Sequence, residues 1–189
     1  MKTLVTAFVL VVAFILTAGT ATAGLHFADS FTTGPGSTPT TTMTINATGG
    51  IYDPVGSVDI SGTAITNTAV LDVNWTDARY PANLVSAGSN VADMVIWFGS
   101  ITNPGLVLTS VAVSEDGSTY VQETFGDFID ATTYSNRPYL VYFDDSTIAP
   151  TQRDSVQTVR ITFSFNNSPT INVDGVSTPE PGTFALFGL

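Results

Sequence analysis

The stretch VRITFSFN (residues 159–166) alternates strictly between apolar and polar side chains. Its apolar residues all fall at odd positions and its polar residues at even positions, so an extended chain would have one apolar and one polar face. After position 24 no stretch of ten or more residues shows the corresponding period of an α-helix. The folded part of the chain is therefore predicted to consist of β-strands.

Short runs rich in β-branched and aromatic residues recur along the chain, and each is bounded by Gly, Pro, Asn or Asp. The clearest runs are residues 68–75, 93–100, 105–114, 139–143 and 159–166, and the weaker ones are residues 25–31, 41–46, 57–64, 119–124 and 170–176. Asp116-Gly117 lies between two of these runs and suits the positive φ angles of a tight hairpin. About ten short strands at this spacing predict an all-β fold, an antiparallel β-sandwich of the jelly-roll type, with a β-barrel as the alternative.

The first 23 residues are typical of a signal peptide helix. One positive charge precedes an apolar run from Leu4 to Leu16, and Ala21 and Ala23 form the small-x-small site that signal peptidase cleaves. The run is shorter than the roughly 20 residues that span a bilayer, although a retained membrane anchor is the alternative. Signal peptidase is therefore an expected partner, and residues 24–177 are expected to fold as one exported domain.

The chain is strongly acidic, with 5 basic and 16 acidic residues and a formal net charge of -11. Removing the signal segment removes Lys2, so the mature chain has one positive charge less and a net charge of -12. Such a surface repels phosphate backbones and anionic lipid headgroups, which argues against nucleic-acid binding. The chain has no cysteine, which excludes thiolate chemistry and favours a bacterial protein that relies on its hydrophobic core.

Candidate catalytic residues are few. His26 is the only histidine, and no G-x-S-x-G motif accompanies it, so a Ser-His-Asp triad is not indicated. The adjacent pairs Glu115-Asp116 and Asp144-Asp145 would point to opposite faces of a strand, whereas glycoside hydrolysis needs two carboxyl groups that flank one bond. No catalytic residue is therefore predicted.

Two aspartates are candidate calcium ligands. Asp29 and Asp174 lie on the first and last candidate strands, and calcium takes oxygen ligands that the loops of a β-sandwich can supply. The predicted architecture resembles jelly-roll carbohydrate-binding modules, many of which hold a structural calcium where the first and last strands meet. The resemblance implies a calcium site at Asp29 and Asp174, and the alternative is that both are solvated surface aspartates.

The chain carries 2 Trp, 6 Tyr and 12 Phe residues, and the faces of aromatic rings can stack on sugar rings. Trp75, Tyr80 and Tyr134 lie in or beside polar, turn-rich sequence, which makes them the candidate glycan platform. Trp97 lies within the apolar run VIWFG and is predicted to be a core residue.

The C-terminal segment, residues 178–189, contains the triplet Pro179-Glu180-Pro181 and an apolar run from Phe184 to Leu189. Proline cannot donate a backbone hydrogen bond and favours extended geometry in the residue before it, so an extended, exposed tail is predicted. The triplet and the run resemble the C-terminal sorting signal of PEP-CTERM proteins. In that family the signal continues into a transmembrane helix and an Arg-rich end, and the membrane protease-transpeptidase exosortase processes it.

This resemblance implies a protein of a Gram-negative-type bacterium that is anchored transiently in the inner membrane. Processing by exosortase would then release it to the cell surface or the extracellular matrix. The apolar run ends at Leu189, well short of the roughly 20 residues that span a bilayer. The given sequence is therefore expected to be a fragment that lacks the end of the signal.

The sequence supports three functions of different classes. The leading expectation is an exported, non-enzymatic β-sandwich protein that is sorted to the cell envelope or extracellular matrix. The alternative is a carbohydrate-binding module for extracellular polysaccharide, with or without a structural calcium. The third is a hydrolase of matrix polysaccharide.

Overall fold

The computed structural model describes residues 25–47, 56–76, 94–103, 105–114, 116–141, 157–166 and 170–179. The predicted signal helix and the chain beyond Pro179 lie outside these residues. The elements, in chain order, are β1 (Leu25–Phe27), β2 (Ser30–Thr33), β3 (Thr41–Asn46), β4 (Ser57–Gly62), β5 (Thr66–Asn74), β6 (Met94–Ile101), β7 (Val107–Ser114), β8 (Val121–Phe128), α2 (Ala131–Tyr134), β9 (Arg137–Val141), β10 (Thr158–Asn166) and β11 (Ile171–Pro179). In this described part of the chain, no helix is long and apolar enough to cross a membrane.

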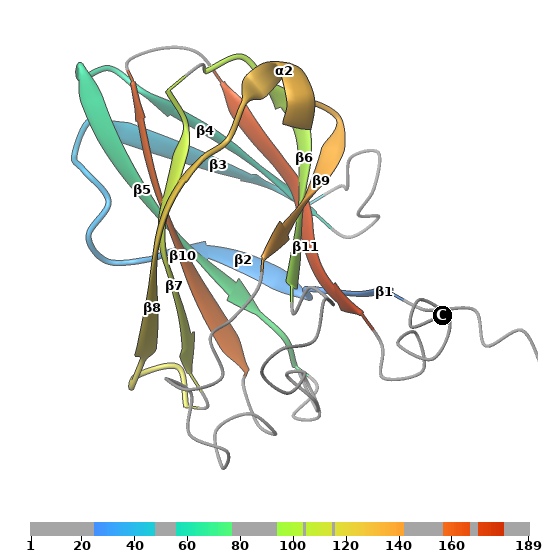
Figure 1. Cartoon of the computed structure of the whole chain (residues 1–189). Coiled ribbons are helices and arrows are strands. Elements are labelled where there is room, and N and C mark those ends of the chain that lie inside the picture. Colours follow the sequence, from blue (N-terminus) through green and yellow to red (C-terminus); the bar gives the residue numbers. More distant parts are fainter. Residues whose placement is uncertain are drawn as a thin grey trace, which may run out of the picture.

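The strands form two antiparallel sheets. Sheet A has the strand order β3-β4-β11-β6-β9, with β1 also paired to β11, and sheet B has the order β2-β5-β10-β7-β8. In Figure 1, β5, β10, β7 and β8 stand on the left, and β6, β9 and β11 stand on the right. Two separate facing sheets confirm the predicted β-sandwich and set aside the closed barrel.

The strand order is that of a jelly roll. The chain passes from β4 in sheet A to β5 in sheet B, then to β6 in sheet A and β7 in sheet B. After the β7–β8 hairpin it alternates again through β9, β10 and β11. Spatial neighbours such as β4 and β11 are therefore distant in sequence, as the interleaved Greek keys of a jelly roll require.

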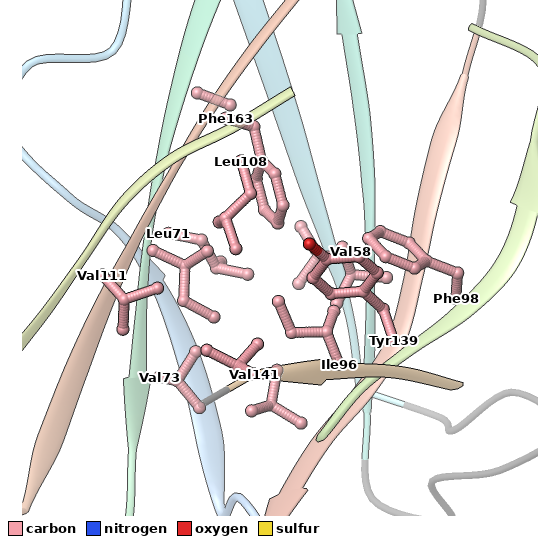
Figure 2. Close-up of a cluster of buried hydrophobic side chains, with 14 of the residues drawn as sticks. Val58, Leu71, Val73, Ile96, Phe98, Leu108, Val111, Tyr139, Val141 and Phe163 are labelled. Carbon is pink, nitrogen blue, oxygen red and sulfur yellow. The ribbon is translucent and has the colours of Figure 1, made fainter. Parts of the chain in front are cut away.

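Apolar side chains from both sheets meet in one core (Figure 2). The residues labelled there are Leu71, Val73, Leu108, Val111 and Phe163 of sheet B, and Val58, Ile96, Phe98, Tyr139 and Val141 of sheet A. Phe98 and Phe163 meet across the two layers, with ring centroids 6.2 Å apart and an interplanar angle of 62°. This is the edge-to-face geometry that aromatic pairs favour, and it joins the centres of the two sheets.

β10 is the regular central strand of sheet B. It pairs with every residue of β5 from Thr66 to Asn74 without a register shift. Val159, Ile161, Phe163 and Phe165 point into the core, and none of them exceeds 2% exposure. The alternation that predicted this strand is therefore confirmed.

β11 is the irregular central strand of sheet A. Its register with β6 shifts between Ile171 and Val173, and again between Val173 and Gly175. The second shift inserts one residue, so Ile171, Val173 and Val176 all reach the core. Ser177 lies on the outer face as a consequence, although uninterrupted alternation would have placed it inside.

The first and last strands meet at one end of the sandwich. β1 pairs with the end of β11, with Leu25 opposite Pro179 and Phe27 opposite Ser177 (Figure 1). β11 therefore runs past residue 177, where the domain was predicted to end, and includes the first proline of the triplet. The residues just before Pro179 are buried, because β1 and β6 flank this part of β11. Thr178 and Pro179, which were predicted to begin the extended tail, are thus part of β11.

The short helix α2, which the sequence pattern does not predict, links β8 to β9. Asp130 is its N-cap, and its carboxylate accepts a hydrogen bond from the backbone N–H of Thr132 at 2.9 Å. This bond, together with bonds from the side chains of Thr133 and Thr132, holds the pKa of Asp130 below its usual value.

Candidate functional site

A tryptophan lies on the outer face of sheet A. Ile96 and Phe98 of β6 point into the core, so Trp97 between them points outward, where it is partly exposed. Its indole Nε1–H donates a hydrogen bond to the Oγ atom of Ser177 at 2.6 Å. The ring centroid of Phe27 is 6.1 Å from that of Trp97, and the two rings are tilted by 40°. Strands from the start, middle and end of the chain thus hold this ring.

Apolar side chains extend the surface around Trp97 toward the edge strand β9. Pro138 is the cross-strand partner of Trp97, and Leu140 is the partner of Val95. Cross-strand partners share a face of the sheet, so these four side chains lie together. Leu140 is 48% exposed and Pro138 is exposed, whereas Val95 is buried beside them at 5% exposure. We call Phe27, Val95, Trp97, Pro138 and Leu140 the aromatic strip.

A row of polar side chains crosses β3, β4 and β11 on the same outer face. The Oδ1 atom of Asp59 accepts a hydrogen bond from Nδ2 of Asn172 at 2.8 Å. Its Oδ2 atom accepts one from Nδ2 of Asn46 at 3.0 Å. Val58 and Ile60 on either side of Asp59 are core residues, which fixes the row on the outer face. We call Asn46, Asp59 and Asn172 the amide row.

The amide row adjoins the aromatic strip. Asn172 packs directly against Gly99 of β6, where a Cβ atom would collide with the side-chain oxygen of Asn172. Gly99 is two residues from Trp97, and two residues of a β-strand span about 7 Å. The outer face of sheet A therefore offers the ring of Trp97 on β6 and, beginning at Asn172 on the neighbouring strand β11, a set of hydrogen-bonding groups.

The outer face of sheet B carries an ion pair between two of its own side chains, Arg160 and Asp72. Nε and Nη2 of Arg160 each donate to one carboxylate oxygen of Asp72 at 2.7 Å, and the guanidinium lies 3.9 Å from the ring centre of Tyr120. The hydrogen bonds to Asp72 raise the pKa of Arg160, and partial burial raises the pKa of Tyr120. These groups bind one another, so we regard them as structural.

The two candidate calcium ligands lie in different environments. Asp29 lies exposed in the bend between β1 and β2, and its Oδ2 atom accepts hydrogen bonds from the backbone N–H (2.6 Å) and hydroxyl (2.8 Å) of Thr76. Asp174 is buried within β11 at 1% exposure. Among the described residues, no group of three or more His, Cys, Asp or Glu residues could hold a metal ion.

The prediction that Trp75 belongs to an exposed glycan platform is wrong, and so is the prediction that Trp97 is a core residue. Trp75 is 3% exposed and belongs to the core. Tyr134 is only partly buried and packs edge-on against Tyr139, with centroids 5.0 Å apart. Tyr80 lies outside the described residues. The alternation of β6 could have found Trp97, since it falls on the opposite face from Ile96 and Phe98.

The turn role expected of Asp116 is confirmed. Its carboxylate accepts hydrogen bonds from the backbone N–H groups of Ser118 and Thr119, both at 2.8 Å, and Gly117 has a φ of 70°. The bond from Thr119, followed by that from Ser118, holds the pKa of Asp116 far below its usual value. This aspartate is therefore committed to the β7–β8 turn.

The other predicted residues are described only in part or not at all. Ala21, Ala23, Glu180 and Pro181, together with Glu115, Asp144 and Asp145, lie outside the described residues. Pro179 is described as the last residue of β11, and His26 as the partner of Thr178 in the backbone pairing of β1 with β11.

No protein-family model and no curated protein matches this chain. Among solved structures, the chain is similar to the carbohydrate-binding module CtCBM11, known from a study of its solution structure, dynamics and binding. The TM-score is 0.46 at 10% sequence identity, over 85% of this chain and 98% of that chain.

Proposed function

We propose that this protein is a non-enzymatic carbohydrate-binding protein of the bacterial envelope or extracellular matrix. The outer face of sheet A is the proposed binding surface. The observation that carries the proposal is the position of Trp97, an aromatic ring on a sheet surface whose orientation is held by a hydrogen bond to Ser177. The adjoining amide row supplies the polar half of the surface.

The chemistry of the face matches that of a sugar. A pyranose ring has apolar C–H faces and a rim of hydroxyl groups that both donate and accept hydrogen bonds. Trp97 and its apolar neighbours present a surface on which such a face can stack. Asn side chains bind hydroxyl groups through their amide protons and carbonyl oxygen, and ionised Asp side chains accept hydrogen bonds from them through the carboxylate oxygens.

The same residues support binding without hydrolysis. Glycoside hydrolysis uses two carboxyl groups about 5–10 Å apart, one of them free to exchange a proton. The amide row contains one carboxylate, Asp59, and both of its oxygens already accept amide protons. Its role is therefore to hold neighbouring side chains and to accept hydrogen bonds.

The test is Trp97→Ala in the protein purified after export. Native gels would contain hydroxyethyl cellulose, dextran, xylan or galactan, and retardation of the protein by a polymer would report binding. We expect the unsubstituted protein to be retarded by at least one polymer. Loss of an anchoring aromatic residue costs about 2 kcal/mol, so Trp97→Ala should weaken that binding about thirtyfold.

Two matched variants complete the test. Trp97→Phe keeps a ring but loses the N–H donor, and it should retain part of the affinity. Tyr120→Ala removes an aromatic ring from the outer face of sheet B, and it should bind as the unsubstituted protein does. Equal binding by Trp97→Ala would contradict the proposal. Absence of binding to every polymer would favour a matrix scaffold without a glycan ligand.

The proposed location rests on the two ends of the chain. Ala21 and Ala23 mark the expected signal-peptidase site, and the triplet begins at Pro179. Since Leu25 pairs with Pro179, both expected processing segments continue from the same end of the sandwich, which suits a domain tethered to a membrane from that end.

The location is tested in the native bacterium by replacing Glu180 and Pro181 with alanine, which leaves Pro179 in β11 intact. We expect the double variant to accumulate in the membrane fraction, while the unsubstituted protein reaches the cell surface or the medium. An unchanged distribution between membrane, surface and medium would show that the triplet is only a linker.

A further inference from the structure

The amide row stands at a defined distance from Trp97. Asn172 packs against Gly99, and Gly99 lies two positions after Trp97 in β6, about 7 Å along the strand. Asn172 itself lies on β11, which pairs with β6 at a strand spacing of about 4.8 Å. A glycan chain that stacks one ring on Trp97 and runs obliquely from β6 toward β11 and β4 would therefore bring its next ring to the Asn172 end of the amide row.

The hydrogen bonds inside the row prepare it for hydroxyl groups. Asp59 holds Asn46 and Asn172 through one Nδ2 proton each, and Nδ2 of Asn46 also donates to the Oγ atom of Ser57 at 3.3 Å. Nδ2 of Asn172 carries a second proton, and each carboxylate oxygen of Asp59 can accept more than one hydrogen bond. Donor and acceptor groups consequently alternate across three neighbouring strands. A sugar hydroxyl, which is both donor and acceptor, fits such a row without leaving a polar group unmatched.

The amide row is negatively charged, which affects the binding of glycans that carry a charge of their own. Asp59 contributes a negative charge at its centre, and the whole chain has a net charge of -11. None of the residues of the row or of the aromatic strip is basic. Arg137 begins β9 as the cross-strand partner of the inward-facing Phe98, so it falls on the opposite alternation from Pro138 in the strip. A carboxylate on the glycan would therefore meet repulsion from Asp59, and the described residues of the row and the strip contain no cation to compensate for it.

We propose that the amide row is a second sugar subsite, and that Asp59 restricts the ligand to neutral polysaccharides by repelling uronic-acid and other carboxylated chains. This inference rests on the proposed function, since it assigns the next subsite and the ligand class of the same face. Asp59 contacts the ligand through its charge and its acceptor oxygens, and Asn172 positions the carboxylate.

The test is Asp59→Asn, measured with polymers that share a backbone and differ in charge. Hydroxyethyl cellulose is paired with carboxymethyl cellulose, and dextran with carboxymethyl dextran. We expect the unsubstituted protein to bind the neutral member of a pair and to bind the carboxymethyl member at least tenfold more weakly. Asp59→Asn should bind the carboxymethyl polymer about three- to fivefold more tightly at low ionic strength, and added salt should erase this gain.

Two further variants separate the charge of Asp59 from general effects. Asp116→Asn changes the net charge equally but lies in the β7–β8 turn, and it should leave both affinities unchanged. Asn172→Ala removes an amide from the row and keeps the charge, so it should weaken neutral binding without any gain for the carboxymethyl polymer. Thermal unfolding of each variant checks that it is folded.

The outcomes distinguish this inference from the proposed function. If Trp97→Ala loses binding to the neutral polymer while Asp59→Asn changes neither affinity, the second subsite is overturned and the proposed function stands. Equal binding of the neutral and carboxymethyl polymers by the unsubstituted protein would also overturn it. If the unsubstituted protein binds none of the polymers, the proposed function fails and the subsite fails with it.

Discussion

The central strands of the two sheets, β10 and β11, differ in regularity. β10 pairs with β5 over its whole length without a register shift, and the one shift in its register with β7 places the extra residue in β7. The register of β11 with β6 shifts twice, and the second shift places an extra residue in β11 itself. In β10 one face therefore lines the core and the other carries polar groups. In β11 the shifts bring residues of both alternation phases, Asn172 and Ser177, to the outer face. The regular strand therefore supports the core, while the irregular strand assembles the candidate site.

The largest expected effect comes from the core face of β10. Phe163 is fully buried at 0% exposure and meets Phe98 of sheet A edge-to-face. Phe163→Ala should lower the free energy of unfolding by about 3–5 kcal/mol, because it leaves a cavity where the two sheets meet. Urea denaturation measures this loss. Thr162→Ser on the outer face of the same strand is the control, and its effect should stay within about 0.5 kcal/mol.

A smaller effect is expected on the outer face of β10. Asp72 binds Arg160 through two hydrogen bonds of 2.7 Å, and the two side chains are 11% and 22% exposed. Because the pair is partly buried, Asp72→Asn should cost about 1–2 kcal/mol, between the values for exposed and buried ion pairs. A double-mutant cycle with Arg160→Met measures the coupling. Strictly additive effects of the two substitutions would show that the pair contributes nothing.

The smallest effect on stability is expected beside β11. Trp97 is only partly buried, so Trp97→Ala removes one hydrogen bond to Ser177 and limited packing, and should cost about 1 kcal/mol. Its effect on polysaccharide binding should be far larger than its effect on unfolding. A loss of stability as large as that of Phe163→Ala would instead make Trp97 a core residue and would erase the contrast between the two strands.

The sequence predicted the regular parts of the fold well. The strong runs all became strands, and alternation correctly separated Phe163 from Thr162, because the pleat places neighbouring side chains on opposite faces. The same reasoning, applied to β5 and β6, would also have placed both tryptophans. Trp75 continues the inward alternation of Leu71 and Val73, and Trp97 alternates with core residues. Polar surroundings and a continuous apolar run concealed this signal.

The candidate site was less predictable. The meeting of the first and last strands is confirmed by the pairing of β1 with β11. The calcium ligands expected there are Asp29, whose carboxylate holds Thr76, and the buried Asp174. Calcium binding by these two residues stays a prediction. No local pattern indicated that Asn46, Asp59 and Asn172 would join in one row, since Asn172 lies 113 residues from Asp59 in the sequence.

The amino-acid sequence by itself determined that this chain forms strands and which side chains of the regular strands enter the core. Both properties follow from the period of two, which is a local property of an extended backbone. Only the tertiary structure decided that Phe27, Trp97 and Ser177 lie together, and that β11 shifts its register between them. Pairings of this kind join segments from opposite ends of the chain, and they are selected by the packing of the whole sandwich against the entropy cost of closing long loops.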